Sequence, residues 1–237
     1  MIKLTEKFRI VTIMAGTLCL AASLLAVPGK QKATTWNFDR LDRIGGFRTT
    51  VLGHPRLIDA VGGPAIEFNG IDDALFVENH PLAGMEKFTF EAWFRPDSGG
   101  APEQRWFHLS ERDPATGQDT DTRVLFEIRV IDNQWALDAF VNTPRGSLTL
   151  LDRNRLHPLD VWYHVAMVYD GIELKSYVNG TLEGKGPLQF SPQGAGHSSV
   201  GVRINRMYFF KGAVRQARFT PHALSPQDFL KVKVTLD

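Results

Sequence analysis

The sequence predicts an all-β protein built as a two-sheet antiparallel sandwich. The main observation is the alternation of apolar and polar residues with a period of two. It is clearest in residues 88–94 and 124–130, which are rich in β-branched and aromatic side chains. Turn-forming pairs such as Asn69-Gly70, Asp170-Gly171 and Asn179-Gly180 punctuate the chain. Short strands separated in this way are typical of a sandwich or a barrel.

Further segments have the same strand character, at residues 106–109, 135–141, 161–169, 174–178, 199–204 and 208–219. One short helix is expected near the C-terminus. Ser225 suits its N-cap, Pro226 its first position, and the helix would continue through Leu230. Because no repeat, low-complexity tract or linker divides the chain, we expect one sandwich domain over residues 33–237.

The first 26 residues are expected to form an export signal and to lie outside the fold. Lys3, Lys7 and Arg9 precede an apolar run from Ile10 to Val27, and small residues lie near the end of that run. A run of about 18 apolar residues is also just long enough to cross a bilayer, so an uncleaved anchor is the alternative. With the signal cleaved, we expect a secreted or periplasmic protein without a membrane span.

Composition narrows the classes of partner. The chain has 27 basic and 26 acidic residues. Loss of residues 1–26 would leave 24 and 25, a formal net charge of −1, which argues against nucleic acid as a partner. The single cysteine, Cys19, lies in the expected signal, so the rest of the chain must be held by its core rather than by disulfides.

Five segments resemble, in order, motifs of the laminin-G-like jelly-roll domains in the concanavalin A-like lectin/glucanase superfamily. They are Ile66–Asp73, Phe88–Pro96 (FTFEAWFRP), Trp162–Gly171 (WYHVAMVYDG), Tyr177–Gly180 (YVNG), and Gly212–Phe219 with the following Ala223-Leu224-Ser225. The resemblance implies a jelly-roll sandwich. It also implies a glycan or polysaccharide as ligand on the concave sheet, or a cell-surface or extracellular protein as partner.

One position departs from the family pattern. The closing motif usually carries an acidic pair that in some relatives helps to hold a structural calcium ion, whereas this chain has Arg215 and Gln216. Calcium is therefore doubtful at that end of the sandwich, and no other cofactor is implied. We expect Arg215 to replace the ion by pairing with Asp39 from the first strand.

An acidic loop between Ser110 and Asp121 is the other place considered for calcium. Loops rich in carboxylate oxygens can hold this ion. The spacing here fits no EF-hand, and an ordinary solvated loop is the alternative. If a metal binds, Asp119 and Asp121 are the candidate ligands.

Strand alternation sorts the central side chains into a core set and an opposite set. The opposite set mixes flat aromatic with planar hydrogen-bonding groups, which suits the apolar faces and hydroxyls of sugars. Asp138 is expected to share its face with Phe140, whereas Trp93 and Trp162 are interpreted as packing residues. A merely solvated sheet is the alternative. The candidate ligand-binding residues are Glu91, Trp106, His108, Glu127, Arg129, Asp138 and His164.

Catalytic spacing is missing from the sequence. The resemblance would place acidic residues as E-x-D-x-x-E on one strand of a glucanase, and residues 127–132 lack that pattern. We therefore expect an exported carbohydrate-binding or adhesion-type lectin-like module without catalysis. Two alternatives stay open. One is a glycoside hydrolase or polysaccharide lyase of the same fold, using Glu91, Glu127 and Asp138 on one face. The other is a structural or protein-interaction domain.

Overall fold

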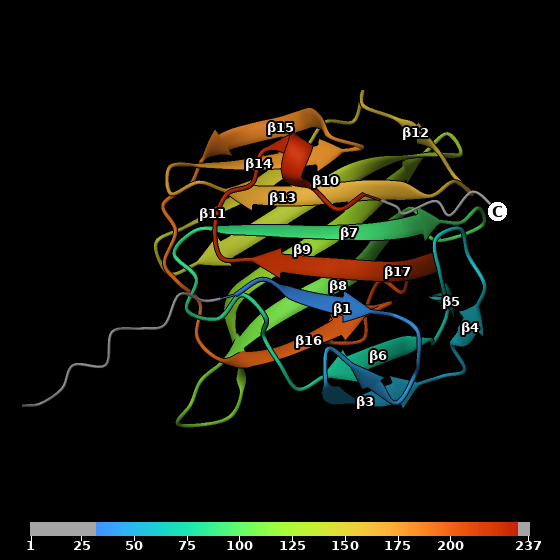
Figure 1. Cartoon of the computed structure of the whole chain (residues 1–237), viewed down its shortest axis with the longest axis horizontal. Coiled ribbons are helices and arrows are strands. Elements are labelled where there is room, and N and C mark those ends of the chain that lie inside the picture. The colour runs from blue at the N-terminus through green and yellow to red at the C-terminus, as the bar shows by residue number, and fades with distance from the viewer. Residues whose placement is uncertain (1–31, 232–237) are drawn as a thin grey trace, which may run out of the picture. The chain divides into compact units, whose positions relative to one another are not determined.

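The computed structural model describes residues 32–231 (Figure 1). The expected signal at residues 1–26 and Cys19 lie outside the described residues. Residues 32–231 lie in one compact unit. Across residues 32–231, helices that are long and apolar enough to cross a membrane are absent.

Eight antiparallel strands form the first sheet. Its order is β15-β14-β13-β7-β17-β5-β4, and β1 pairs with the C-terminal half of β17. The bounds are β1 Thr34–Asn37, β4 Arg56–Ile58, β5 Ala65–Asn69, β7 Phe88–Pro96, β13 Tyr163–Tyr169, β14 Glu173–Val178, β15 Thr181–Pro187 and β17 Lys211–Thr220.

Nine antiparallel strands form the second sheet. Its order is β11-β10-β9-β8-β16-β6-β3-β2, and the short β12 pairs with β10. The bounds are β2 Arg43–Ile44, β3 Phe47–Leu52, β6 Ala74–Val77, β8 Glu103–Arg112, β9 Asp119–Ile131, β10 Gln134–Thr143, β11 Gly146–Leu151, β12 His157–Pro158 and β16 Gly196–Val200.

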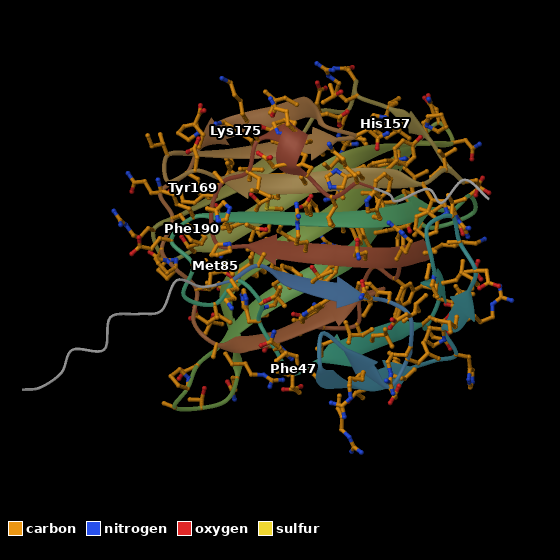
Figure 2. The ribbon with its side chains drawn as sticks, viewed as in Figure 1. Phe47, Met85, His157, Tyr169, Lys175 and Phe190 are labelled. Atoms are coloured by element: carbon orange, nitrogen blue, oxygen red, sulfur yellow. The ribbon has the colours of Figure 1, made fainter. Side chains whose placement is uncertain are left out.

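The two sheets pack face to face around an aromatic core. Figure 1 shows β7, β13 and β17 crossing in front of β8, β9 and β10. Phe90 of β7 meets Phe126 of β9 with ring centroids 4.5 Å apart. Tyr169 and Phe190 lie together at one end of the core, 4.9 Å apart (Figure 2). The predicted jelly-roll sandwich is therefore confirmed.

Two expected strand boundaries differ from the structure. The segments expected at 199–204 and 208–219 are shorter, because residues 201–210 form a loop between β16 and β17. Gly201 begins this loop with φ of +88°, and a Cβ there would lie 2.4 Å from the Phe68 ring. The acidic loop is also shorter than expected, because β8 extends to Arg112 and β9 starts at Asp119.

The C-terminal helix is a single 3-10 turn, η1 Pro226–Asp228, preceded by Ser225 as expected. It ends before Phe229, whose backbone is extended, so the helix does not reach Leu230. Phe229 is buried with Leu224 against Ala166 and Tyr177. The C-terminal segment 224–230 thereby covers part of the outward face of the eight-stranded sheet.

Candidate functional site

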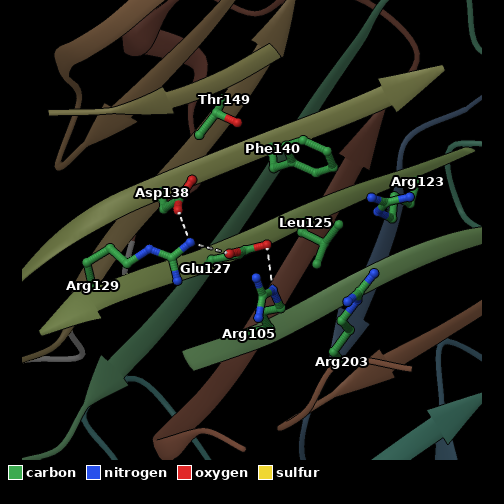
Figure 3. A pocket seen from close by; sticks show the side chains of 9 residues that line it. All are labelled: Arg105, Arg123, Leu125, Glu127, Arg129, Asp138, Phe140, Thr149 and Arg203. Carbon is green, nitrogen blue, oxygen red and sulfur yellow. Dashed lines mark hydrogen bonds and ion pairs between the residues drawn. The ribbon is translucent and has the colours of Figure 1, made fainter. Parts of the chain in front are cut away.

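A polar cleft of about 260 Å³ opens on the outward face of the nine-stranded sheet (Figure 3). Alternate residues of β9 line it, while Val124, Phe126 and Ile128 between them point into the core. Strands β8, β10 and β11 and the loop 201–210 supply the rest of its wall. We call this site the arginine cleft. Its lining residues are Arg105, Arg123, Leu125, Glu127, Arg129, Asp138, Phe140, Thr149 and Arg203.

One end of the arginine cleft holds a network of ion pairs. Glu127 and Asp138 stand opposite each other on β9 and β10. Arg129 Nη2 bridges them, 3.0 Å from Glu127 Oε2 and 2.7 Å from Asp138 Oδ2. Arg105 Nε donates to Glu127 Oε1 at 3.0 Å, and Glu103 contacts both arginines. The carboxylates are thus held in fixed positions by guanidinium groups.

Burial shapes the charges of this network. The exposed fractions of Glu127 and Asp138 are only 4% and 1%. Burial raises the pKa of both carboxyls, and for Glu127 the neighbouring Asp138 raises it further, against the pull of Arg105 and Arg129. Asp138 Oδ1 is buried and has no hydrogen-bond partner among residues 32–231. A ligand hydroxyl could supply that missing donor.

The other end of the arginine cleft is apolar and basic. Leu125 and Phe140 lie between the ion-pair network and two further arginines, Arg123 and Arg203 (Figure 3). The Arg123 guanidinium lies 5.1 Å from the centroid of the Phe140 ring. Burial lowers the pKa of Arg203, and the positive charges of Arg123 and Arg105 lower it further.

His108 supports the loop that carries Arg203. Its side chain is buried on the outward side of β8, and its Nδ1 accepts the Ile204 N–H at 3.1 Å. Burial lowers the pKa of His108 well below its ordinary value, and Arg203 and Arg123 add to this effect. The ring is therefore neutral near pH 7 and acts beside the cleft as a support rather than as an exposed contact.

Of the predicted ligand-binding residues, the structure brings Glu127, Arg129 and Asp138 together in the arginine cleft, with Phe140 on the face expected for it. Trp106 was assigned to the wrong face. It is fully buried and stacks between Phe94 and Phe126 with centroids 4.4 and 5.3 Å away. A β-bulge between Arg105 and Phe107 breaks the alternation, so Trp106 and Phe107 both enter the core.

Glu91 and His164 belong to the other sheet, so the expectation of one shared face was wrong for them. His164 Nε2 lies 2.8 Å from Glu91 Oε2 beneath the C-terminal segment. Glu91 also accepts from Arg218 Nε at 2.6 Å and from the Leu230 N–H at 2.7 Å. Alternation within a strand predicts the side of its own sheet, but it does not predict which sheet the strand joins.

Arg215 does not pair with Asp39, contrary to expectation. Its Nη1 donates to the Gly62 carbonyl at 2.5 Å, and its guanidinium lies 5.8 Å from the Trp93 ring centroid. Burial lowers the pKa of Arg215. Asp39 is exposed, and only the neighbouring Phe38 reaches Arg215, through a backbone hydrogen bond of 2.9 Å.

The two candidate metal ligands point to different partners. Asp119 Oδ1 lies 2.5 Å from His197 Nε2, whereas Asp121 is fully exposed and 3.2 Å from Arg123 Nη1. Within residues 32–231, groups of three or more His, Cys, Asp or Glu side chains with the geometry of a metal site are absent. The structure therefore does not gather a calcium ligand set around this pair.

Sequence reasoning missed Arg105, Arg123, Thr149 and Arg203. Arg123 has the same strand parity as Glu127 and Arg129, so extending the predicted strand 124–130 by one residue would have found it. Arg105 pairs with Glu127 across β8 and β9, a register that depends on the bulge. Arg203 sits on a loop, and no sequence pattern signals its approach to the sheet.

A second pocket, of about 450 Å³, lies on the eight-stranded sheet. Trp93, Trp162 and His164 line it together with the C-terminal segment. Arg95 lies 5.6 Å from the Trp162 ring centroid, so both tryptophans also pack against arginines, as Trp93 does against Arg215. This tryptophan pocket has less charge than the arginine cleft.

Solved structures share this fold at low sequence identity. Domain 4 of an extracellular arabinanase from Geobacillus stearothermophilus, solved with arabinotriose, matches with a TM-score of 0.55 and 18% identity, over 83% of this chain and 97% of that one. The receptor-binding domain of botulinum neurotoxin type G gives 0.58 and 13%, over 84% and 50%. Trypanosoma rangeli sialidase gives 0.56 and 11%, over 82% and 31%. The chain thus spans half or less of the last two.

Sequence comparison assigns the family. No curated protein is significantly similar to the chain in sequence. A family model described as the concanavalin A-like lectin/glucanases superfamily matches residues 69–229, more than half of the chain. This stretch includes four of the five motifs quoted above and strands β7 to β17. The protein therefore belongs to the concanavalin A-like lectin/glucanase superfamily.

Proposed function

We propose that this protein is a carbohydrate-binding module and that the arginine cleft is its ligand surface. The observation that carries the proposal is the composition of the cleft. Leu125 and Phe140 form an apolar floor, and planar charged groups surround it in positions fixed by ion pairs. Sugars need this combination, because each ring has an apolar C–H face and a rim of hydroxyls.

The chemistry of binding follows from this layout. A sugar ring would lie against Phe140, and its hydroxyls would reach Glu127, Asp138 and Arg129. Asp138 Oδ1 has an unused lone pair, and the carboxylates need no rearrangement because Arg129 already bridges them. A preorganised site loses little conformational entropy on binding, so moderate contacts are enough for a measurable affinity.

A glycan array followed by calorimetry tests the proposal. We expect Phe140→Ala to weaken the binding of the selected oligosaccharide about tenfold, because the stacking face is lost. Trp162→Ala, in the tryptophan pocket of the opposite sheet, is the matched control and should leave the affinity unchanged. If Trp162→Ala abolishes binding and Phe140→Ala does not, the ligand surface is on the other sheet.

Hydrolysis of the bound glycan is a second candidate, favoured by one observation. Glu127 and Asp138 are two neighbouring carboxyls in one cleft, and a raised pKa, as Glu127 has, is what the general acid of a glycosidase requires. Both carboxylates already pair with Arg129, which favours a role in binding over a role in catalysis. Release of reducing ends from a polysaccharide, abolished by Glu127→Gln, would establish the enzyme instead.

We also propose that the protein is exported and that its ligand is extracellular. The proposal rests on the sequence of residues 1–26, and an adhesion role with a protein partner would be served by the same location. N-terminal sequencing of the protein recovered outside the cytoplasm tests it. A start near residue 27 is expected, and an intact Met1 on membrane-bound protein would show a retained anchor.

A further inference from the structure

We infer that the saccharide recognised by the arginine cleft is acidic, with its carboxylate or sulfate group seated between Arg123 and Arg203. The inference rests on the proposed function and names the class of ligand. It depends on how charge is distributed along the cleft, which has a balanced end and an unbalanced end.

The balanced end is the ion-pair network. Arg105 and Arg129 contact Glu103 and Glu127 at 2.5–3.0 Å, and Arg129 also contacts Asp138. Each of these guanidinium groups already has carboxylate partners. An anion placed here would meet buried negative charge, so this end favours neutral hydroxyl groups.

The unbalanced end consists of Arg123 and Arg203. Within residues 32–231, the Arg203 guanidinium has no hydrogen bond or ion pair. Arg123 has one carboxylate partner, Asp121, which is fully exposed and 3.2 Å away. Solvent screens that contact strongly. Arg123 and Arg203 nevertheless act on each other, since the charge of Arg123 lowers the pKa of Arg203. An anion bound between these two guanidinium groups would relieve the repulsion between their positive charges.

Hydrogen bonds fix the main chain of the loop around Arg203. The Arg206 N–H donates to the Arg203 carbonyl at 2.7 Å, and the Arg203 N–H donates to the Met207 carbonyl at 3.2 Å. The next residue, Ile204, is anchored on His108. The loop thus presents Arg203 at the cleft in a fixed turn, although the guanidinium gains no internal partner there.

The two ends together orient a sugar. With the ring against Leu125 and Phe140, the acidic substituent would reach Arg123 and Arg203, and hydroxyls on the other side would reach Glu127 and Asp138. The reversed pose would bring two negative groups together. This polarity predicts discrimination between an acidic sugar and its neutral form, not only general attraction to polyanions.

The test compares matched pairs of polysaccharides on the full chain by calorimetry at two salt concentrations. Polygalacturonate is compared with its methyl ester, dextran sulfate with dextran, and polyglutamate serves as a non-saccharide polyanion. We expect Arg203→Gln to weaken the binding of the preferred acidic polymer at least about tenfold, because a charge-assisted hydrogen bond is lost. Arg206→Gln, on the same exposed loop but outside the cleft, is the control and should bind normally.

Each outcome has a distinct meaning. Binding of polygalacturonate but not of dextran sulfate assigns the site to carboxylates, and the opposite result assigns it to sulfates. Equal binding of acidic and neutral partners, insensitive to Arg203→Gln but lost in Phe140→Ala, overturns the inference and leaves the proposed function intact. Polyglutamate binding as tight as that of the acidic polysaccharide also overturns it. Failure of every saccharide removes the proposed function as well.

Discussion

Among single residues, the character of the arginine cleft depends on which charged side chains already have an ion-pair partner. Glu127, Arg129 and Asp138 form one network because their strand positions place them on one outward face, as alternation predicts. Trp106 shows where such reasoning stops. One extra residue at the bulge in β8 turns it into the core, and nothing in the local sequence marks a bulge. His108, beyond the bulge, returns to the outward side.

The buried His80 predicts how the stability of the protein depends on pH. It is buried, its Nε2 lies 2.7 Å from Gln193 Oε1, and burial lowers its pKa to about 4. The unfolded imidazole has its ordinary pKa of 6.5, so the unfolded state takes up the proton first as pH falls. We expect the titration of His80 to lower the free energy of unfolding by about 3 kcal/mol as the pH falls from 7 to 4.

Urea unfolding at a series of pH values measures this contribution. His80→Asn keeps an acceptor for the Leu82 N–H but cannot titrate, so the pH dependence of its stability should be flatter than that of the wild type. His222→Asn, at an exposed position, is the control. Identical pH slopes for wild type and His80→Asn would contradict the assignment.

At the scale of elements, residues that we expect on one face from strand alternation belong to two different sheets. Glu91 of β7 and His164 of β13 lie in the eight-stranded sheet, whereas the arginine cleft is built on β8, β9 and β10. Most strands could be predicted from their own periodicity and turns. Their order in two sheets depends on long-range pairing, which no local pattern contains. The loop 201–210 was missed for the same reason.

The C-terminal segment 224–230 is anchored on the buried carboxylate of Glu91, and a substitution there tests this contact. Glu91 is fully buried and accepts the Leu230 N–H, the Arg218 guanidinium and His164. We expect Glu91→Gln to lower the free energy of unfolding by about 3 kcal/mol, because it leaves buried donors without a charged acceptor. Hydrogen exchange at Leu230 should accelerate as the segment loosens.

Glu67→Gln is the matched control for that variant. Glu67 also pairs with two arginines, Arg56 and Arg95, but its side chain is 21% exposed. Its loss should therefore cost well under half as much. Equal destabilisation by the two substitutions, or unchanged exchange at Leu230 in Glu91→Gln, would show that the buried carboxylate does not anchor the segment.

At the scale of the whole molecule, the sandwich offers two outward faces of different character. One carries the arginine cleft, with fixed charges around an apolar floor. The other carries the tryptophan pocket beside the C-terminal segment. The family resemblance predicted the fold and a sugar-binding sheet, but it could not choose the face. The arginine cleft is favoured by its ion-pair network, by Arg203 without an ion-pair partner among residues 32–231, and by Arg123 with only the fully exposed Asp121 as partner.

Amide chemical-shift mapping with a galacturonic acid trisaccharide tests this choice most directly. We expect the shifts to cluster at residues 123–129, 138–142 and 201–208, around the arginine cleft. We also expect Trp162→Ala to leave them unchanged. Shifts concentrated at Trp93, Trp162 and Asn179 instead, or no shifts at millimolar ligand, would contradict the claim that the arginine cleft is the saccharide site.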